Sequence, residues 1–222
     1  DALSDDGVDP DVVENIVTIL EAELSTPSAD ATADEQAAAL LLAEVQLAAS
    51  GVSDTIDGLN NLVSDLVGGD TSAIEGIDST DDALGLIFPE SQSVEDVESQ
   101  LEALFDSAAA YSYYGETLGA LGTSSELDGG EQTEVAFVAA ISGITSYLVN
   151  NLATDDSEAA RSIAITQLAS SIVNGTPLTL NADPGLETAE DPMEYMFGTG
   201  ISAVIADGFT DLEAMLSSFG GA

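Results

Sequence analysis

Residues 135–154 read VAFVAAISGITSYLVNNLAT, a stretch without a charged side chain in a strongly acidic chain. Its large apolar residues surround most of a helical circumference, and its small residues recur four positions apart along one side. A helix that is apolar nearly all round is either buried in a protein core or crosses a membrane. We predict that Val135–Leu152 forms the central helix of an all-α bundle.

A membrane span is the weaker interpretation of this stretch. It reaches the ~20 residues that a span requires. However, serine, threonine and asparagine dilute its apolar character, and no basic residue flanks it to orient it in a bilayer.

Small residues also let a neighbouring backbone approach, so they predict close helix packing. The predicted close-packing positions are Ala136, Ala139, Ala140 and Gly143 here, and Gly115 and Gly119 in the preceding helix.

The composition is typical of a folded chain, but it includes almost no basic residues. Its 222 residues include 42 acids and one base, Arg161, which gives a formal net charge of −41. The hydrophobic content of 45% favours a folded core over disorder. Charged residues make up 19% of the chain, below the typical value of about 25%. The anomaly is therefore the absence of lysine and arginine more than an excess of acids.

The spacing of these charges predicts how the fold depends on salt. A globular protein of 22.5 kDa exposes about 9,500 Å², so neighbouring net charges stand roughly 15 Å apart. That spacing exceeds the Debye length of ~10 Å at 0.1 M salt but lies within the ~30 Å at 0.01 M. We expect seawater-like ionic strength to suffice for stability, and very dilute buffer to destabilise the fold.

The composition also excludes several classes of function. Phosphate backbones and anionic lipids are bound by lysine and arginine, so neither nucleic acid nor an anionic membrane is an expected partner. The chain has no cysteine, histidine or lysine, which removes thiolate, Ser-His-Asp, Schiff-base and P-loop chemistry. A carboxylate pair could still catalyse hydrolysis, but 42 acids single out no pair. We predict no catalytic residue and no required cofactor.

Capping signals and apolar periodicity predict about eight helices and no strand ladder. The predicted starts are Asp9–Pro10, Thr32 with Glu35, Ser93, Asp128 with Glu131, Asp155 with Glu158, Asp191–Pro192, and Thr210 with Glu213. The predicted segments include helices over 52–67, 93–121 and 156–173 and a loop over 174–190 with a short extended piece at Leu178–Leu180. An acidic arm, 1–9, precedes one domain, 10–222, in which 70–92 is the only candidate internal boundary.

Two features of single side chains carry expectations of their own. Arg161 should be paired in so acidic a chain, and Glu158 lies three residues earlier on the same helical face. A partner from another helix or another subunit is the alternative. The tyrosines at 111, 113 and 114 cannot all face one core, so at least one is expected at a surface or interface.

Hard cations are the expected ligands, if any, because carboxylate oxygens are the abundant donors. None of the acidic clusters fits the EF-hand pattern, and solvated or helix-capping acids are the simpler interpretation of each. The candidate metal ligands are Asp5, Asp6, Asp9 and Asp11; Asp78, Asp81 and Asp82; and Asp128 with Glu131. Calcium or another divalent cation would be the bound ion.

We interpret the chain as an exported, non-enzymatic protein that forms a homo-oligomer or polymer. A filament, sheath, surface layer or matrix in a saline or divalent-cation-rich medium would fit. A start at Asp1 without methionine fits a processed export product, and it fits a trimmed chain equally well. The first alternative is a soluble acidic protein that binds divalent cations or a basic protein. The second is a carboxylate enzyme from a salt-adapted organism.

Overall fold

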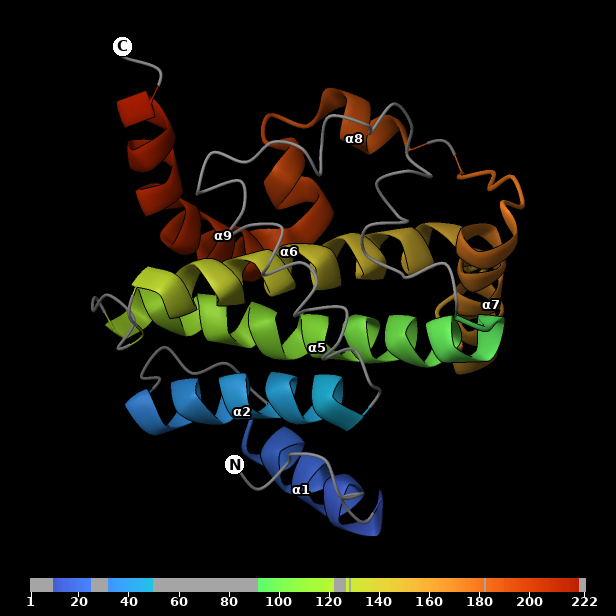
Figure 1. Cartoon of the computed structure of the whole chain (residues 1–222), viewed down its shortest axis with the longest axis horizontal. Helices are drawn as coiled ribbons and strands as arrows, with labels where there is room; N and C mark the ends of the chain where they lie inside the picture. The colour runs from blue at the N-terminus through green and yellow to red at the C-terminus, as the bar shows by residue number, and fades with distance from the viewer. Residues whose placement is uncertain are drawn as a thin grey trace. The chain divides into compact units, whose positions relative to one another are not determined.

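The computed structural model describes residues 10–24, 32–49, 92–121, 127, 129–181 and 183–219. Within these residues the regular structure is α-helical, with no strand, which confirms the all-α prediction for this part of the chain (Figure 1). The described helices are α1 (Pro10–Glu23), α2 (Ala33–Ala49), α5 (Val94–Leu121), α6 (Gly129–Leu152), α7 (Glu158–Asn174), α8 (Pro184–Thr188) and α9 (Pro192–Phe219).

The described residues do not show the expected eight helices around a central 135–152. They contain six longer helices and the short α8. The uncharged stretch lies within α6, which keeps Ile144 46% exposed. A helix at the centre of a bundle would bury such a side chain, so the absence of charge does not make α6 central.

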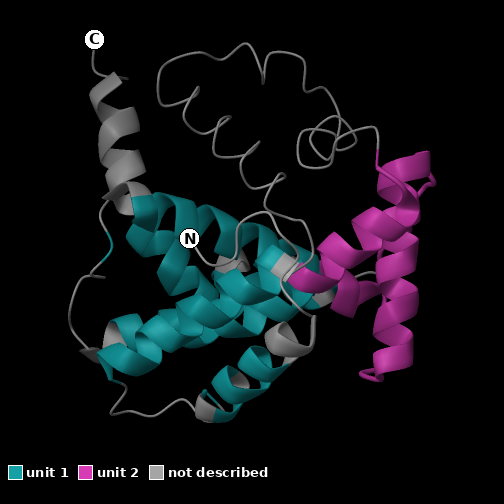
Figure 2. Ribbon diagram, turned by 60° about the horizontal axis from the view of Figure 1, so that its bottom comes forward, with its two compact units in different colours: residues 1–49, 104–147, 182–222 teal, residues 50–103, 148–181 magenta. Residues whose placement is uncertain are grey.

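The chain divides into two compact units (Figure 2). Unit 1 comprises residues 1–49, 104–147 and 182–222, and unit 2 comprises residues 50–103 and 148–181. Helices α5 and α6 each run from one unit into the other. The acidic arm 1–9, the helix expected over 52–67 and the boundary expected in 70–92 lie outside the described residues.

Several helices begin where the capping signals predict. Helix α1 begins at Pro10. Before α2, the Thr32 amide donates to Glu35 Oε2 at 2.7 Å and the Glu35 amide donates to Thr32 Oγ1 at 3.3 Å. Before α5, Ser93 and Asp96 form the same reciprocal pair, at 3.0 and 3.2 Å. These caps satisfy amides that a helix start leaves without partners.

The C-terminal half of the chain departs from the predicted helix bounds. Helix α8 lies inside the loop expected over 174–190, while residues 175–181 have no regular structure. The separate helix expected after Thr210 is part of α9, which runs from Pro192 to Phe219. Helix α9 is interrupted instead at Gly198, whose φ of 75° and ψ of 169° are accessible mainly to glycine.

The three neighbouring tyrosines of α5 are all buried, so the expectation of a surface tyrosine is wrong. Tyr111, Tyr113 and Tyr114 are at most 6% exposed. Tyr111 lies close enough to Glu44 of α2 and Glu134 of α6 for both to affect it electrostatically. Because α5 has neighbours on different sides, residues pointing in different directions from it are all covered.

Glycines bring α9 against α5 and α6 in unit 1. A Cβ atom added at Gly115 of α5 would overlap the carbonyl group of Gly200 in α9, and one added at Gly200 would overlap Ser112 of α5. One added at Gly208 of α9 would overlap Ala136 of α6. Backbones approach this closely only where no side chain intervenes.

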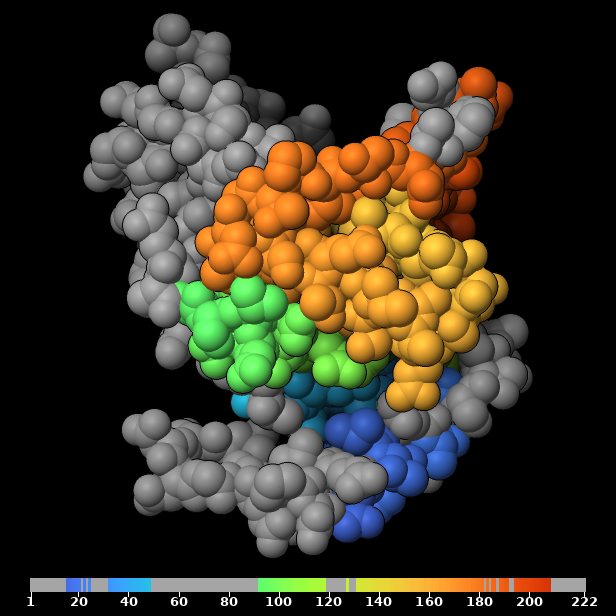
Figure 3. All heavy atoms as spheres, turned by 90° about the vertical axis from the view of Figure 1, so that its right-hand side faces the viewer, coloured from blue at the N-terminus to red at the C-terminus, as the bar shows by residue number. Residues whose placement is uncertain are grey.

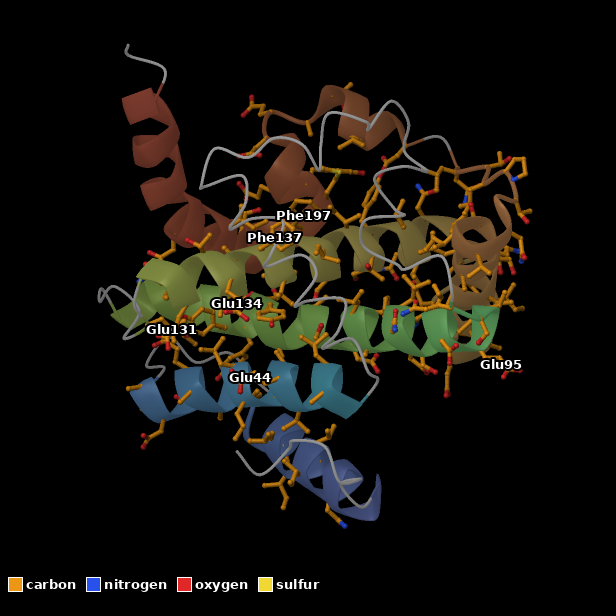
Figure 4. All side chains as sticks on the ribbon, viewed as in Figure 1. Glu44, Glu95, Glu131, Glu134, Phe137 and Phe197 are labelled. Carbon is orange, nitrogen blue, oxygen red and sulfur yellow. The ribbon has the colours of Figure 1, made fainter. Side chains whose placement is uncertain are left out.

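The remaining predicted packing positions have mixed surroundings. A Cβ atom at Gly143 of α6 would lie 3.0 Å from Cδ1 of Phe197, which Figure 4 labels on α9. Ala136 and Ala139 are fully buried and Ala140 is partly exposed. The surroundings of Gly119 lie outside what the structure describes. Small side chains on α6 therefore accompany close contact with α9.

A buried hydroxyl pair joins α5 to α6. Ser107 Oγ and Ser142 Oγ are 2.9 Å apart, and both residues are fully buried. Ser107 Oγ also donates to the carbonyl oxygen of Leu104 at 3.1 Å. Ser142 can therefore donate to Ser107, which satisfies both hydroxyl groups inside the core.

Candidate functional site

Helix α7 begins with a serine cap. Ser157 Oγ accepts a hydrogen bond from the Ala160 amide at 3.2 Å, and Asp155 Oδ1 accepts one from the Ser157 amide at 2.9 Å. Hydrogen bonds from Ser157 lower the pKa of Asp155. The predicted cap, Asp155 with Glu158, therefore lies two residues too early, because Ser157 caps the helix and Asp155 supports the turn before it.

Helix α7 ends at a glycine, and the segment after it is fixed to α6. Gly175 has a φ of 61° and a ψ of 28°, the left-handed conformation typical of helix C-termini. At the far end of 175–181, the Asn181 amide donates to Asn151 Oδ1 at 2.8 Å, and Asn151 Nδ2 donates to the Asn181 carbonyl at 3.2 Å. Asn181 Nδ2 also donates to the Asn151 carbonyl. These bonds hold the returning chain beside the end of α6.

One side of α7 is buried and the other is exposed. The buried residues are Ala160, Ala164, Ile165, Leu168 and Ala169. The exposed side, which we call the α7 face, consists of Ala159, Ser162, Ile163, Thr166 and Gln167. These positions lie three or four residues apart and so share one helical face. Figure 3 shows part of this unit's surface, with α7 and the segment after it in orange shades.

The α7 face lies in an acid-free part of the sequence. Residues 159–182 contain no aspartate or glutamate, although the whole chain contains 42 acids. Ile163 is 60% exposed, and Leu180 in the following segment is 46% exposed. This surface therefore combines exposed apolar side chains with hydroxyl and amide groups, without negative charge of its own. The signal was present in the sequence as the widest interval between successive acids.

Arg161, the one base, lies in the same stretch. Its Nη2 atom donates to the backbone carbonyl oxygen of Asp156 at 2.6 Å. The expected ion pair with Glu158 stays a prediction. The hydrogen bond places the guanidinium group beside the start of α7, where the neighbouring acids lie.

The predicted metal ligands are not brought together in the described part of the chain. Asp5, Asp6, Asp9, Asp78, Asp81, Asp82 and Asp128 lie outside the described residues. Asp11 lies in α1, but its side chain is not described, and Glu131 is exposed at the start of α6. Among the described residues, no group of three or more acids could hold a metal ion.

A second cluster of polar groups surrounds Asp183 in unit 1. Tyr195 Oη donates to Asp183 Oδ1 at 2.9 Å, and Tyr147 Oη donates to Oδ2 at 3.0 Å. The amides of Gly185 and Leu186 also donate to Oδ1, so Asp183 caps α8. Sequence patterns did not indicate this cluster, because its members come from three separate segments.

These hydrogen bonds determine the ionisation of the cluster. The bond from Tyr195, together with those from Tyr147 and the two amides, lowers the pKa of Asp183. The bond to Asp183 raises the pKa of Tyr195, and burial followed by the bond to Asp183 raises that of Tyr147. The carboxylate thus stays ionised and the phenols stay protonated at neutral pH. These hydrogen bonds link α8 and α9 through Asp183.

Two acids, Glu44 of α2 and Glu134 of α6, lie near enough to the buried Tyr111 of α5 to influence its ionisation. Figure 4 labels Glu44 on α2 and Glu134 on α6. Partial burial of its carboxyl group, and then repulsion by Glu134, raise the pKa of Glu44, although more than a third of the residue surface is exposed. Burial and then the charges of Glu44 and Glu134 raise the pKa of Tyr111. The charged form of Glu44 therefore weakens the packing it borders.

Helix α6 is also the one described helix that is long and apolar enough to cross a membrane, over Glu131–Leu152. Core helices of soluble proteins meet the same criterion, so this finding does not distinguish the two. Comparison with protein-family models, with curated proteins and with solved structures found no match.

Proposed function

We propose that this protein is an exported, non-enzymatic subunit that assembles with copies of itself into an extracellular filament, sheath, surface layer or matrix. The observation that carries the proposal is the exposed acid-free surface of unit 2, over residues 159–181, in a chain with a net charge of −41. A highly charged chain gains solubility from its acids. A surface that omits them and exposes Ile163 and Leu180 is suited to contact with another protein.

Charge also decides the medium in which such an assembly can form. Two copies repel each other through their net charges, and salt shortens the range of that repulsion to ~10 Å at 0.1 M. Carboxylates that still face each other across a contact can be bridged by calcium or other divalent cations. A saline or divalent-cation-rich medium therefore favours assembly, and we propose no cofactor beyond such bridging ions.

The test is the size of the purified chain as a function of salt and divalent cations. Light scattering and electron microscopy in 0.5 M NaCl with 10 mM CaCl₂ should show polymers, which shrink after chelation and dialysis into 10 mM NaCl. At the higher salt concentration the charges of neighbouring copies are screened, and at the lower one they are not. A monomer under all conditions would refute the proposal. If calcium raised the melting temperature of that monomer, a soluble cation-binding protein would be favoured instead.

The same proposal predicts the salt dependence of folding. Raising NaCl from 10 mM to 500 mM should raise the melting temperature, measured by circular dichroism, because screening weakens repulsion among the acids. Sucrose at matched osmolality serves as the control for effects unrelated to charge. An unchanged melting temperature would show that charge repulsion does not limit stability, and the saline setting would lose its support.

A further inference from the structure

We infer that Asn174 is the attachment site of an N-linked glycan. Asn174, Gly175 and Thr176 form the motif Asn-x-Ser/Thr, which marks the acceptor of N-glycosylation when its middle residue is not proline. The chain has seven asparagines, and Asn174 is the only one within this motif, so a single glycan is expected. The inference rests on the export that we propose, because N-glycans are attached to exported chains.

The motif lies where a helix ends. Asn174 is the last residue of α7, and Gly175 follows it with a φ of 61° and a ψ of 28°. This left-handed conformation ends the helix, and residues 175–181 have no regular structure. Pro177 in turn restricts Thr176 to extended backbone. The motif therefore lies at the point where the chain leaves α7.

The motif is also open to its surroundings. All three of its residues are exposed, and a Cβ atom added at Gly175 would have no atom within 4 Å. Hydrogen bonds between Asn151 and Asn181 hold the far end of the segment beside α6. An oligosaccharide is bulky and needs a surface position of this kind. It can be attached at Asn174 without displacing a packed side chain.

The charge of the surrounding surface gives the glycan a role. Residues 159–182 contain no acid, whereas the acids elsewhere in the chain favour its solubility. A glycan hydrates a surface without adding negative charge, so it supplies solubility where the acids are missing. Asn174 lies about 16 Å from Ile163 along α7, at 1.5 Å per residue. A glycan at Asn174 therefore leaves Ile163 available for the contact that we propose.

The attachment is a glycosyl transfer from a lipid-linked oligosaccharide, in which phosphate joins the sugar to a polyprenyl lipid. The side-chain nitrogen Nδ2 of Asn174 forms a bond to the anomeric carbon of the first sugar, and the bond from that carbon to the phosphate oxygen breaks. Nδ2 loses a proton, and the lipid phosphate leaves with the electron pair of the broken bond. The chain supplies only the amide, so its lack of cysteine, histidine and lysine is no obstacle.

The first experiment is mass spectrometry of the full chain purified from the cells that make it. Glu158 and Glu187 are successive glutamates, so cleavage after glutamate releases the motif within one peptide, 159–187. The mass of this peptide should exceed that of its sequence by one glycan. Fragmentation that preserves the sugar should place the added mass on Asn174 and not on Asn181, which the same peptide contains. An unmodified peptide would overturn the inference.

The second experiment tests the motif with variants of the full chain made in the same cells. Asn174→Gln and Thr176→Ala should each abolish the added mass, whereas Thr176→Ser keeps the hydroxyl group and should retain it. Thr179→Ala, at an exposed threonine outside the motif, is the matched control and should leave the glycan in place. Circular dichroism checks that each variant is folded. A glycan that persists in Thr176→Ala would refute attachment through this motif.

The outcomes separate this inference from the proposed function. A chain that is recovered outside the cell but is unmodified at Asn174 would refute the inference and leave export standing. A glycan at Asn174 on a chain that forms no polymer would leave the inference standing and refute the proposed assembly. An unmodified chain that is recovered only from the cell interior would refute both.

Discussion

Two stretches of the chain carry no charge, and their surroundings differ. Residues 135–154 lie largely in α6, where Ala136, Ala139 and Ser142 are fully buried. Residues 162–182 are equally uncharged but include Ile163 and Leu180, both well exposed. Burial explains the absence of charge at the buried positions of the first stretch, because an unpaired charge is costly in a core. It does not explain the second, for which we propose contact with another copy.

A matched pair within α7 tests this comparison with the largest expected effect. Ile165 is buried and Ile163 is exposed. Ile165→Ala should lower the free energy of unfolding by about 2–4 kcal/mol through lost burial and a residual cavity. Ile163→Ala should change it by less than about 0.5 kcal/mol in the monomer. Urea titration in dilute protein measures both, and equal losses would show that Ile163 is a core residue.

The close contact between Gly208 of α9 and helix α6 provides the next test. Gly208→Ala places a methyl group against Ala136 and the backbone of Gln132. We expect a net loss of about 2 kcal/mol, because overpacking outweighs the gain in helix propensity. Ala159→Val, which adds bulk at an exposed α7 position, is the control and should cost less than about 0.7 kcal/mol. If urea titration showed comparable losses of unfolding free energy for both variants, the contrast between the packed α6 and the exposed face of α7 would be contradicted.

The serine pair between α5 and α6 has a smaller expected effect. Ser142→Ala removes one partner of the Ser107 hydroxyl and should cost about 1 kcal/mol. Ser107 keeps its bond to the Leu104 carbonyl, which limits the loss. The double variant with Ser107→Ala should cost less than the sum of the single variants, and strict additivity in urea titration would show that the two hydroxyls do not interact.

The smallest expected effect concerns Glu44. Its pKa is raised in the folded state, so its charged form opposes folding at neutral pH, and this cost disappears as the pH falls through the folded pKa. Glu44→Gln should therefore raise the melting temperature at pH 7, with an advantage that shrinks toward pH 4. Glu102→Gln, at an exposed position of α5, controls for removal of one charge. If Glu44→Gln raised the melting temperature by the same amount at pH 4 as at pH 7, titration of Glu44 would be excluded as the cause.

The sequence predicted helix starts well where a pair of side chains close together in the sequence determines them. Thr32 with Glu35 is an example, because both groups of the cap lie three residues apart. The start of α7 was misplaced, since Asp155 and Ser157 are both good caps and local chemistry does not choose between them. The burial of Tyr111, Tyr113 and Tyr114 depends on how many helices surround α5, which the periodicity of one helix does not encode.

The candidate surface was predictable in part. The acid-free interval 159–182 can be seen in the sequence, but its exposure cannot, because the uncharged stretch 135–154 has a similar composition and is largely packed. The cluster around Asp183 was not predictable, since its phenol groups come from helices distant in the chain. Of the predicted metal ligands, Glu131 alone has a described side chain, and it is exposed.

The positions of the tyrosines give unit 1 an optical signature of its own. All five tyrosines, at positions 111, 113, 114, 147 and 195, lie in unit 1, and the chain has no tryptophan. Tyrosine absorbance and tyrosine fluorescence therefore report unit 1 alone, while far-ultraviolet dichroism reports helices of both units. Coincident melting curves at the two wavelengths would mean that the shared helices α5 and α6 couple the units into one cooperative transition. Separate curves would mean that unit 2 can unravel while the tyrosine-bearing half of the molecule persists.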